Sequence, residues 1–319
     1  MTTTPAVLSA GIIVADHICT PIAHMPAAGE LVMADQLLLT IGGCAANAAV
    51  DLARMGVSAA VVGRVGDDAF GRIVMEMLGS HGLDTSTIHQ TPGAATSQTL
   101  IVNVAGQDRR FIHSFGANAL FRAADIPLDR LRQSRILYLG GYLLMPNMTH
   151  DELIPVFRAT REAGVKTVLD VAIPWPGDYL PRLETLLPHV DVFLPNNHEG
   201  QLITGEADPV RQAETFRRLG AKTVVVTCGA DGAILMDERV RLKSGVYDVP
   251  FVDGSGGGDA FDAGYICGML DGLDVEGRLR LASALGASCV RAVGTTPGVF
   301  TREECQEFQR TRQLAIERI

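Results

Sequence analysis

Short apolar runs alternate with amphipathic stretches over most of the chain, a pattern that predicts buried strands separated by helices. The expected strands lie at residues 8–14, 59–62, 136–139, 166–170, 190–194, 223–227 and 233–236. The expected helices lie at residues 45–55, 151–163, 209–219 and 257–270, with a further one that includes 75–79. Strands joined by helices of this length favour parallel β-α-β crossovers, and therefore an α/β fold whose mostly parallel sheet is covered on both faces.

Two segments depart from this pattern. Residues 96–114 alternate between apolar and polar positions, which predicts a hairpin of strands at 99–104 and 110–113 joined by the turn 105–108. Residues 18–39 have no helical periodicity. We expect these two segments to form a small sheet outside the main body. The predicted organisation is therefore a single domain, 1–319, with a lid formed by about 17–40 and 96–115.

Composition narrows the class of protein. The 319 residues are 47% hydrophobic and 20% charged, which is typical of a globular protein with a substantial core. The net charge of −9 argues against nucleic-acid binding, which requires a basic patch, and the scattered cysteines indicate neither a zinc site nor a disulfide framework. With neither a leader-like N-terminus nor an apolar run of membrane-spanning length, we expect a cytoplasmic protein without nucleic-acid or membrane partners.

The most informative motif is Asp253-Gly254-Ser255-Gly256-Gly257-Gly258-Asp259, at the start of an expected helix. Consecutive glycines let backbone N–H groups converge, and a helix start adds unpaired donors and a positive dipole end, so the segment suits a phosphate. Asp259, on the first turn, would face the hydroxyl that attacks this phosphate. The alternative is a glycine-rich loop in which Asp259 only stabilises the helix N-terminus.

Polar residues also follow several expected strands, where ligands of parallel sheets bind: Asp16, Asp170, Asn196 and Thr227. Asn196 and Glu199, three positions apart, suit a hydrated magnesium ion that is held mainly by substrate phosphates, although the same pair is typical of a helix capping box.

Two further segments contain glycine turns. Gly42-Gly43-Cys44-Ala45-Ala46-Asn47 is a second glycine-to-helix junction, which fits either a sugar against the backbone or tight helix packing. The strand at 223–227 runs into a turn that contains Gly229 and Gly232.

Together these segments, with Gly63–Gly71 and Gly116-Ala117-Asn118, resemble in type and order the PfkB, or ribokinase-like, family of carbohydrate kinases. The resemblance implies a three-layer α/β/α sandwich with a mostly parallel central sheet and a β-sheet lid. It also implies transfer of the ATP γ-phosphate, with Mg²⁺, to a hydroxyl of a small sugar or sugar-like substrate, and a homodimer formed through the lid.

The resemblance also implies roles for individual residues. Asp259 would be the catalytic base, and the N–H groups of Gly256, Gly257 and Gly258 would form the anion hole. The other implied roles are substrate binding by Asp16, Gly42, Gly43 and Asn47; nucleotide binding by Asn196, Thr227, Gly229, Gly232 and Ser283; magnesium binding, through water, by Asn196 and Glu199; and possible K⁺ binding by Asp253 and Ser255.

Some positions depart from the family pattern. Ribokinases proper carry Gly-Gly-Lys-Gly-Ala-Asn where this chain has Gly42-Gly43-Cys44-Ala45-Ala46-Asn47, and Gly254 stands where threonine is common. The sequence therefore does not identify the acceptor. A nucleoside kinase of the same fold remains an alternative, as does a sensor that binds sugar or nucleotide without chemistry, although a sensor needs no base such as Asp259.

Overall fold

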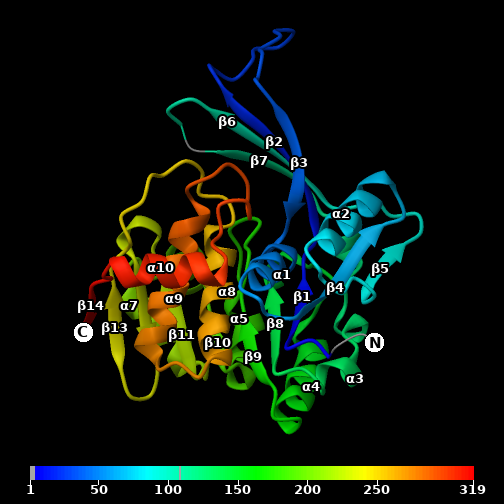
Figure 1. Ribbon diagram of the computed structural model, residues 1–319. Helices are drawn as coiled ribbons and strands as arrows, with labels where there is room; N and C mark the ends of the chain where they lie inside the picture. Colours follow the sequence, from blue (N-terminus) through cyan, green and yellow to red (C-terminus); the bar gives the residue numbers. More distant parts are fainter. Residues whose placement is uncertain (1–3, 108) are drawn as a thin grey trace.

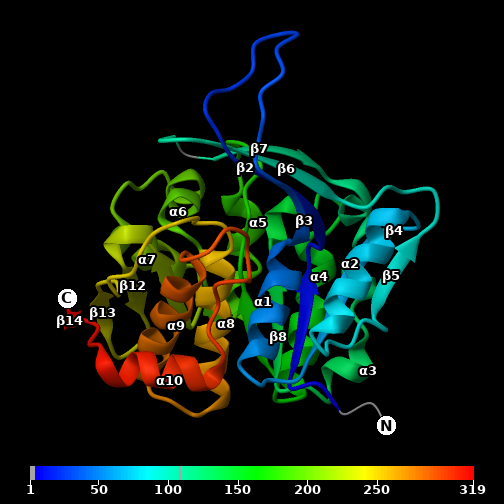
Figure 2. The same cartoon turned by 45° about the horizontal axis from the view of Figure 1, so that its top comes forward.

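The computed structural model describes residues 4–107 and 109–319, which form a central sheet between two helical layers with a smaller sheet standing above the body (Figure 1, Figure 2). The ten-stranded central sheet has the order β14-β13-β12-β11-β10-β9-β8-β1-β4-β5. Its strands are β1 (Val7–Gly11), β4 (Ala59–Gly66), β5 (Ile88–Thr91), β8 (Ile136–Gly140), β9 (Lys166–Leu169), β10 (Val192–Phe193), β11 (Thr223–Thr227), β12 (Ala233–Met236), β13 (Arg241–Ser244) and β14 (Ile316–Arg318). The predicted fold class is confirmed.

The helices divide between the two faces of the sheet. They are α1 (Cys44–Arg54), α2 (Ala69–Ser80), α3 (Leu128–Leu131), α4 (His150–Glu162), α5 (Leu180–Glu184), α6 (Asn197–Thr204), α7 (Pro209–Arg218), α8 (Gly257–Leu270), α9 (Val275–Cys289) and α10 (Arg302–Thr311). Short 3-10 turns lie at Gly116–Leu120, Ala123–Asp125, Tyr142–Leu144, Leu187–His189 and Gly229–Asp231. Apolar side chains of α1, α2 and α8–α10 share one core, and those of α3–α7 share another.

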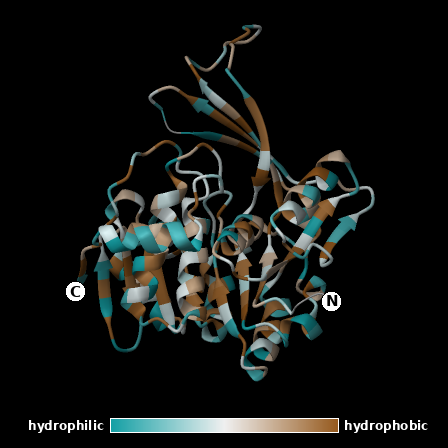
Figure 3. Cartoon of the chain, in the orientation of Figure 1, coloured by the Kyte–Doolittle hydropathy of each residue, from teal (hydrophilic) through white to brown (hydrophobic). Residues whose placement is uncertain are grey.

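Side chains alternate between the two faces along each buried strand, so one strand contributes apolar side chains to both cores. Within β11, Val225 packs into the core beneath α8 and α9, whereas Val224 and Val226 pack into the opposite one. Successive side chains of a strand point to opposite faces, so a continuous apolar run is what a doubly covered sheet requires. The hydropathy colouring shows the resulting apolar strands in the middle of the body (Figure 3).

The sheet is parallel from β5 to β11 and antiparallel from β11 to β14. The expectation that residues 233–236 continue the helix-separated parallel pattern is therefore wrong. A five-residue connection joins β11 to β12 with only a 3-10 turn, Gly229–Asp231, in it. A connection this short permits only an antiparallel neighbour.

The lid sheet has the order β3-β2-β6-β7 and is formed by β2 (Val14–Ile22), β3 (Leu37–Gly42), β6 (Gln98–Val104) and β7 (Arg110–Ser114). β2 pairs antiparallel with β3 and parallel with β6, and the predicted hairpin joins β6 to β7. Residue 108 of its predicted turn lies outside the described residues.

The expected strand at 8–14 is two strands with a break between them. Gly11 has φ 140°, and Ile12 and Ile13 connect the central sheet to the lid. The buried Asn118 fixes this connection: its Oδ1 accepts from the Ile13 N–H at 3.2 Å, and its Nδ2 donates to the Ile13 carbonyl at 2.9 Å. Asp16 is thereby carried beyond the central sheet and into the lid strand β2.

A second group of hydrogen bonds holds the lid segment that leads into β6. Asp68, the N-cap of α2, accepts from the Thr96 N–H at 2.7 Å and from the Thr96 hydroxyl at 2.6 Å, just before β6 begins. Asp68 thus connects the start of α2 to the segment that leads into β6. None of the helices in residues 4–107 and 109–319 has the length and apolar character needed to cross a membrane.

Candidate active site

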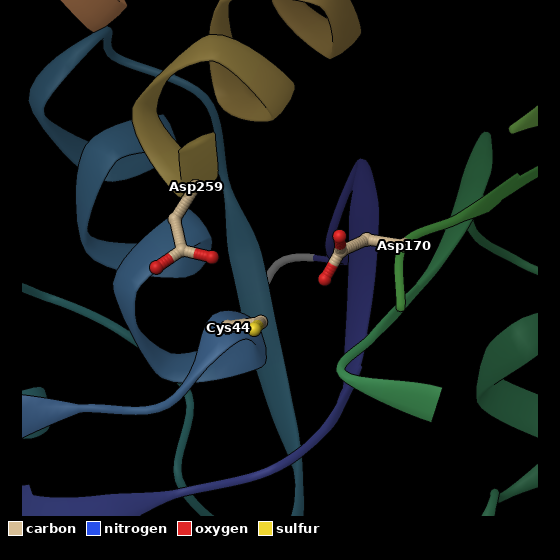
Figure 4. A group of neighbouring side chains, drawn as sticks. All are labelled: Cys44, Asp170 and Asp259. Carbon is tan, nitrogen blue, oxygen red and sulfur yellow. The ribbon is translucent and has the colours of Figure 1, made fainter. Parts of the chain in front are cut away.

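Three side chains from distant parts of the sequence meet at the carboxyl end of the parallel strands. Cys44 lies at the start of α1, Asp170 directly after β9, and Asp259 in the first turn of α8. The thiol and a carboxylate oxygen of each aspartate lie within 4.8 Å of one another, and their polar ends point toward a common space (Figure 4). This is the edge of the sheet where parallel α/β proteins bind their ligands.

The glycine segment forms the turn into α8. Gly256 is the N-cap with φ 73°, and a side chain there would overlap Thr295, so both conformation and space require glycine. The space beside Gly258 is open. The Gly257 N–H lies 3.4 Å from the Gly254 carbonyl, whereas the Gly258 N–H has no acceptor among the described residues. The helix start therefore presents unpaired donors toward an open space.

Asn47 connects the second glycine junction to Asp259. Gly43 has φ 91° and precedes α1, which places the buried Asn47 on the first turn of that helix. Its Nδ2 donates to Asp259 Oδ2 at 2.8 Å, while its Oδ1 is buried without a partner among the described residues. A buried amide oxygen without a donor is a position where a ligand hydroxyl can donate.

Burial and mutual repulsion dominate the electrostatics of this cluster. Burial and then the charge of Asp259 raise the pKa of Asp170 to about 8. Burial also raises the pKa of Asp259, and burial followed by the charge of Asp170 raises that of Glu199 well above its usual range. Like charges that share a desolvated site disfavour ionisation of each other. The raised pKa values of Asp170, Asp259 and Glu199 therefore indicate that the surrounding described side chains do not supply enough positive charge to offset the three carboxylates.

Asp16 enters the site from the lid. Burial, partly offset by a hydrogen bond from Thr99, raises its pKa to about 7, with a further contribution from the charge of Asp259. A side chain at Gly42 would overlap the Asp16 carboxylate, so glycine is needed where β3 passes it. Asp16 and Asn47 thus approach Asp259 from the lid and from the body.

Asn196 and Glu199 form the expected capping box at the start of α6. The Glu199 N–H donates to Asn196 Oδ1 at 2.9 Å, and the Asn196 N–H donates to Glu199 Oε2 at 2.9 Å. The box holds Glu199 close enough to Asp170 for the two charges to interact. Oxygen ligands of high negative charge are those that Mg²⁺ prefers, so the residues present fit that ion.

The expected nucleotide residues lie on the neighbouring elements. Thr227 bridges to Asn196 at the end of β11, and Gly229 and Gly232 form the following turn with φ of 55° and 89°. A side chain at Gly232 would overlap Ser244. Ser283 is half-buried on α9, which packs along α8.

Asp253 and Ser255 do not fit a potassium ion. Asp253 Oδ1 accepts from the Ser255 N–H at 2.9 Å, and Oδ2 accepts from the Gly294 N–H at 3.0 Å. The guanidinium of Arg109 lies against both residues, with Nη1 2.8 Å from Ser255 Oγ and 3.3 Å from Asp253 Oδ1. A cation bound by these two side chains would meet a positive charge already in place.

The sequence indicated Asp170 by its position after an expected strand but gave it no role, and it did not assign Cys44, Arg109 or Asp262 to the site. Asp262, one turn beyond Asp259, is buried and accepts from the Tyr138 hydroxyl at 2.9 Å, and its repulsion with Asp170 and Asp259 could not be read from the sequence. Arg109 reaches the site only because the hairpin folds over the body.

The pfkB family carbohydrate kinase model matches residues 5–302 of the chain. A ribokinase of Haemophilus influenzae is 26% identical over 304 residues, which cover 93% of this chain and 96% of the relative. A probable fructokinase-4 of Arabidopsis thaliana is 27% identical, covering 84% of this chain and 86% of that protein. The solved structure of Arabidopsis thaliana ribokinase, complexed with ribose and ATP, is 25% identical, with a TM-score of 0.81 and 96% and 98% coverage.

The raised pKa of Asp170 predicts a pH-dependent cost in stability. Between its unfolded value of 3.8 and about 8, the folded state holds the proton more tightly than the unfolded chain, so the free energy of unfolding falls as pH rises. Replacing Asp170 by Asn should remove at least about 1 kcal/mol of this fall, since one pKa unit corresponds to about 1.4 kcal/mol. Urea unfolding at several pH values measures it.

The exposed Asp178 lies on the loop that follows Asp170, and Asp178→Asn is the matched control that should leave the pH profile unchanged. If Asp170→Asn and the unchanged chain lost the same stability between about pH 5 and pH 8, the assignment of a strongly raised pKa to Asp170 would be wrong.

Proposed function

The chain belongs to the pfkB family of carbohydrate kinases and is an ATP-dependent sugar kinase, and we propose that Asp259 is the base that activates the acceptor hydroxyl. The observation that carries this proposal is the position of Asp259. Its carboxylate is held by Asn47 at the start of α8, beside unpaired helix N–H donors and facing Asp170 (Figure 4). The proposed base and the proposed anion-binding turn thus lie next to each other.

The proposed reaction is an in-line transfer of the γ-phosphoryl group. Asp259 takes the hydroxyl proton while a bond forms between the acceptor oxygen and the γ-phosphorus, and the bond from that phosphorus to the bridging oxygen of ADP breaks. On this proposal the N–H groups of Gly256, Gly257 and Gly258 donate to the oxygens of the migrating group. Donors fixed in advance in this way stabilise developing charge without reorganising.

Magnesium supplies positive charge to the phosphates, and Glu199 with Asn196 would hold it, mainly through water. The support is electrostatic: Glu199, Asp170 and Asp259 repel each other, and a divalent cation would relieve that repulsion. On this proposal Thr227, Gly229 and Gly232 lie along the nucleotide, with Ser283 on its adenine side.

A neutral polyhydroxylated acceptor suits the substrate side best. Asp16 and Asn47 offer carboxylate and amide groups to hydroxyls, beside Gly42 and Gly43, which allow close approach to the backbone. The acidic cluster disfavours sugar acids and sugar phosphates. Cys44 stands where ribokinases carry lysine, so no cationic side chain offsets the cluster from that position. A nucleoside acceptor is not favoured, because a ribokinase and a probable fructokinase are among the similar relatives.

The outer face of the lid supports a homodimer. Leu37, Leu100 and Ile112 are 78%, 42% and 67% exposed, and strand register places Leu100 directly opposite Ile112 on one face. Large apolar side chains gathered on one exposed face favour an interface. We therefore propose that two lids pair through these residues, in a protein that works in the cytoplasm.

Replacing Asp259 by Asn should lower kcat by about 10²- to 10⁴-fold with little change in KM, because general-base assistance acts in the transition state. An ADP-coupled assay measures both constants. The exposed Asp248→Asn is the control for a lost carboxylate away from the site. Near-normal turnover by Asp259→Asn would refute its role as base.

A panel of neutral sugars, sugar acids and nucleosides, each with MgATP, tests the acceptor class. We expect acceptor-dependent ADP release with neutral sugars and at least about tenfold lower kcat/KM for sugar acids. Preference for a nucleoside would overturn the sugar assignment. Ligand binding without any ADP release would instead identify a sensor.

Replacing Ile112 by Lys should convert the dimer to a monomer, because the interface would have to bury an unpaired charge. Light scattering coupled to gel filtration measures the mass. Val246→Lys, at an exposed apolar position outside the lid, should leave the mass unchanged. A monomeric unchanged chain, or a dimer that survives Ile112→Lys, would contradict pairing through this face.

A further inference from the structure

The buried Asp253 carboxylate is the central acceptor of the loop that precedes α8. Its two oxygens accept from the N–H groups of Ser255 and Gly294, at 2.9 and 3.0 Å, so it ties the glycine segment to the residues beyond α9. The Val252 and Asp253 N–H groups donate to the Val290 carbonyl, at 2.8 and 3.2 Å. This network fixes where the backbone enters the anion-binding turn at Gly256.

A buried carboxylate needs a positive partner, because hydrogen bonds from neutral groups only partly replace its hydration. That partner reaches Asp253 from the lid. Arg109, directly before β7, places Nη1 3.3 Å from Asp253 Oδ1 and 2.8 Å from Ser255 Oγ. Its side chain is 26% exposed and that of Asp253 only 5%, so solvent screens this pair weakly.

Two neighbouring contacts fix the position of the guanidinium. Its central carbon lies 5.6 Å from the centre of the Phe111 ring, which orients it by a cation–π contact. On the other side, the guanidinium passes Gly254, where a Cβ would lie only 3.2 Å from a guanidinium nitrogen. Gly254 stands where relatives commonly carry threonine, so the missing side chain leaves the space through which Arg109 reaches the loop.

We propose that Arg109 is a positioning residue that replaces a bound monovalent cation beside the anion hole, so that this kinase works without potassium. Unlike a free ion, Arg109 belongs to the hairpin β6–β7, so the charge that neutralises the loop before α8 is part of the lid.

This inference uses the proposed kinase activity for one readout and needs no substrate for the other. Rates and melting temperatures should be measured in about 0.1 M potassium chloride and in the same concentration of tetramethylammonium chloride, so that ionic strength is constant. For the unchanged chain we expect less than about a twofold difference in kcat/KM and no shift in melting temperature.

Arg109→Ala should lose about tenfold or more in kcat in tetramethylammonium, with KM for the acceptor changed less, because a displaced anion hole acts on the transition state. Potassium should restore several-fold of that loss and raise the melting temperature of the variant. Guanidinium chloride at about 20 mM, far below denaturing concentrations, should also restore it. Arg109→Lys should keep most of the activity in tetramethylammonium.

The matched control is Arg110→Ala, which removes the adjacent exposed arginine, whose side chain contacts Gln107. It should behave as the unchanged chain in both salts. Activation of the unchanged chain by potassium of about fivefold or more would overturn the proposal. So would an Arg109→Ala variant that is fully active in tetramethylammonium, or a folded but inactive one that neither cation restores. If no acceptor is phosphorylated at all, the kinase assignment fails, while the melting temperatures still decide the role of Arg109.

Discussion

The site depends on one constraint, the convergence of several buried or half-buried carboxylates at one edge of the sheet. Asp170 follows a central strand, Asp259 opens α8 and Glu199 opens α6, so backbone positions set by the sheet bring the three acids together. Burial and repulsion raise their pKa values, and the free energy of this arrangement is recovered only when positive charge enters. The magnesium ion that accompanies ATP in the proposed function would bring such charge.

Positive character beside Asp259 comes largely from the backbone. The start of α8 directs N–H donors toward an open space, the position proposed for the phosphoryl group, and glycine at 256 is required there by φ 73° and by the proximity of Thr295. Backbone donors cannot move away, unlike a lysine on a flexible stem, so the anion site is as rigid as the turn that forms it. The packing of α8 against α9 and α1 supplies that rigidity.

The sequence predicted the layers and the ends of most elements, because apolar runs and glycine stops are local signals. The helix expected at 45–55 is α1, which is followed by Gly56 with φ 73°, and α8 begins at Gly257 as predicted. Prediction was wrong where a long-range contact decides. Only Asn118, far along the chain, shows why the apolar run 8–14 breaks at Gly11. The antiparallel pairing of β12 has a different cause, the short connection between β11 and β12.

The site also combines local features, which the sequence predicts, with long-range contacts, which it does not. Glycine motifs and the capping box at Asn196 are local, whereas the partners of Asp259 come from α1 and from the end of β9, which no spacing reveals. Cys44 shows the effect of such a partner. Burial, then the charge of Asp259, raises the pKa of its thiol, so it stays neutral and adds no further negative charge. A lysine there would offset one carboxylate, whereas a neutral thiol leaves the cluster acidic. That acidity is the reason for the proposed selectivity toward uncharged acceptors, and it leaves the magnesium ion of the proposed mechanism to balance the charge.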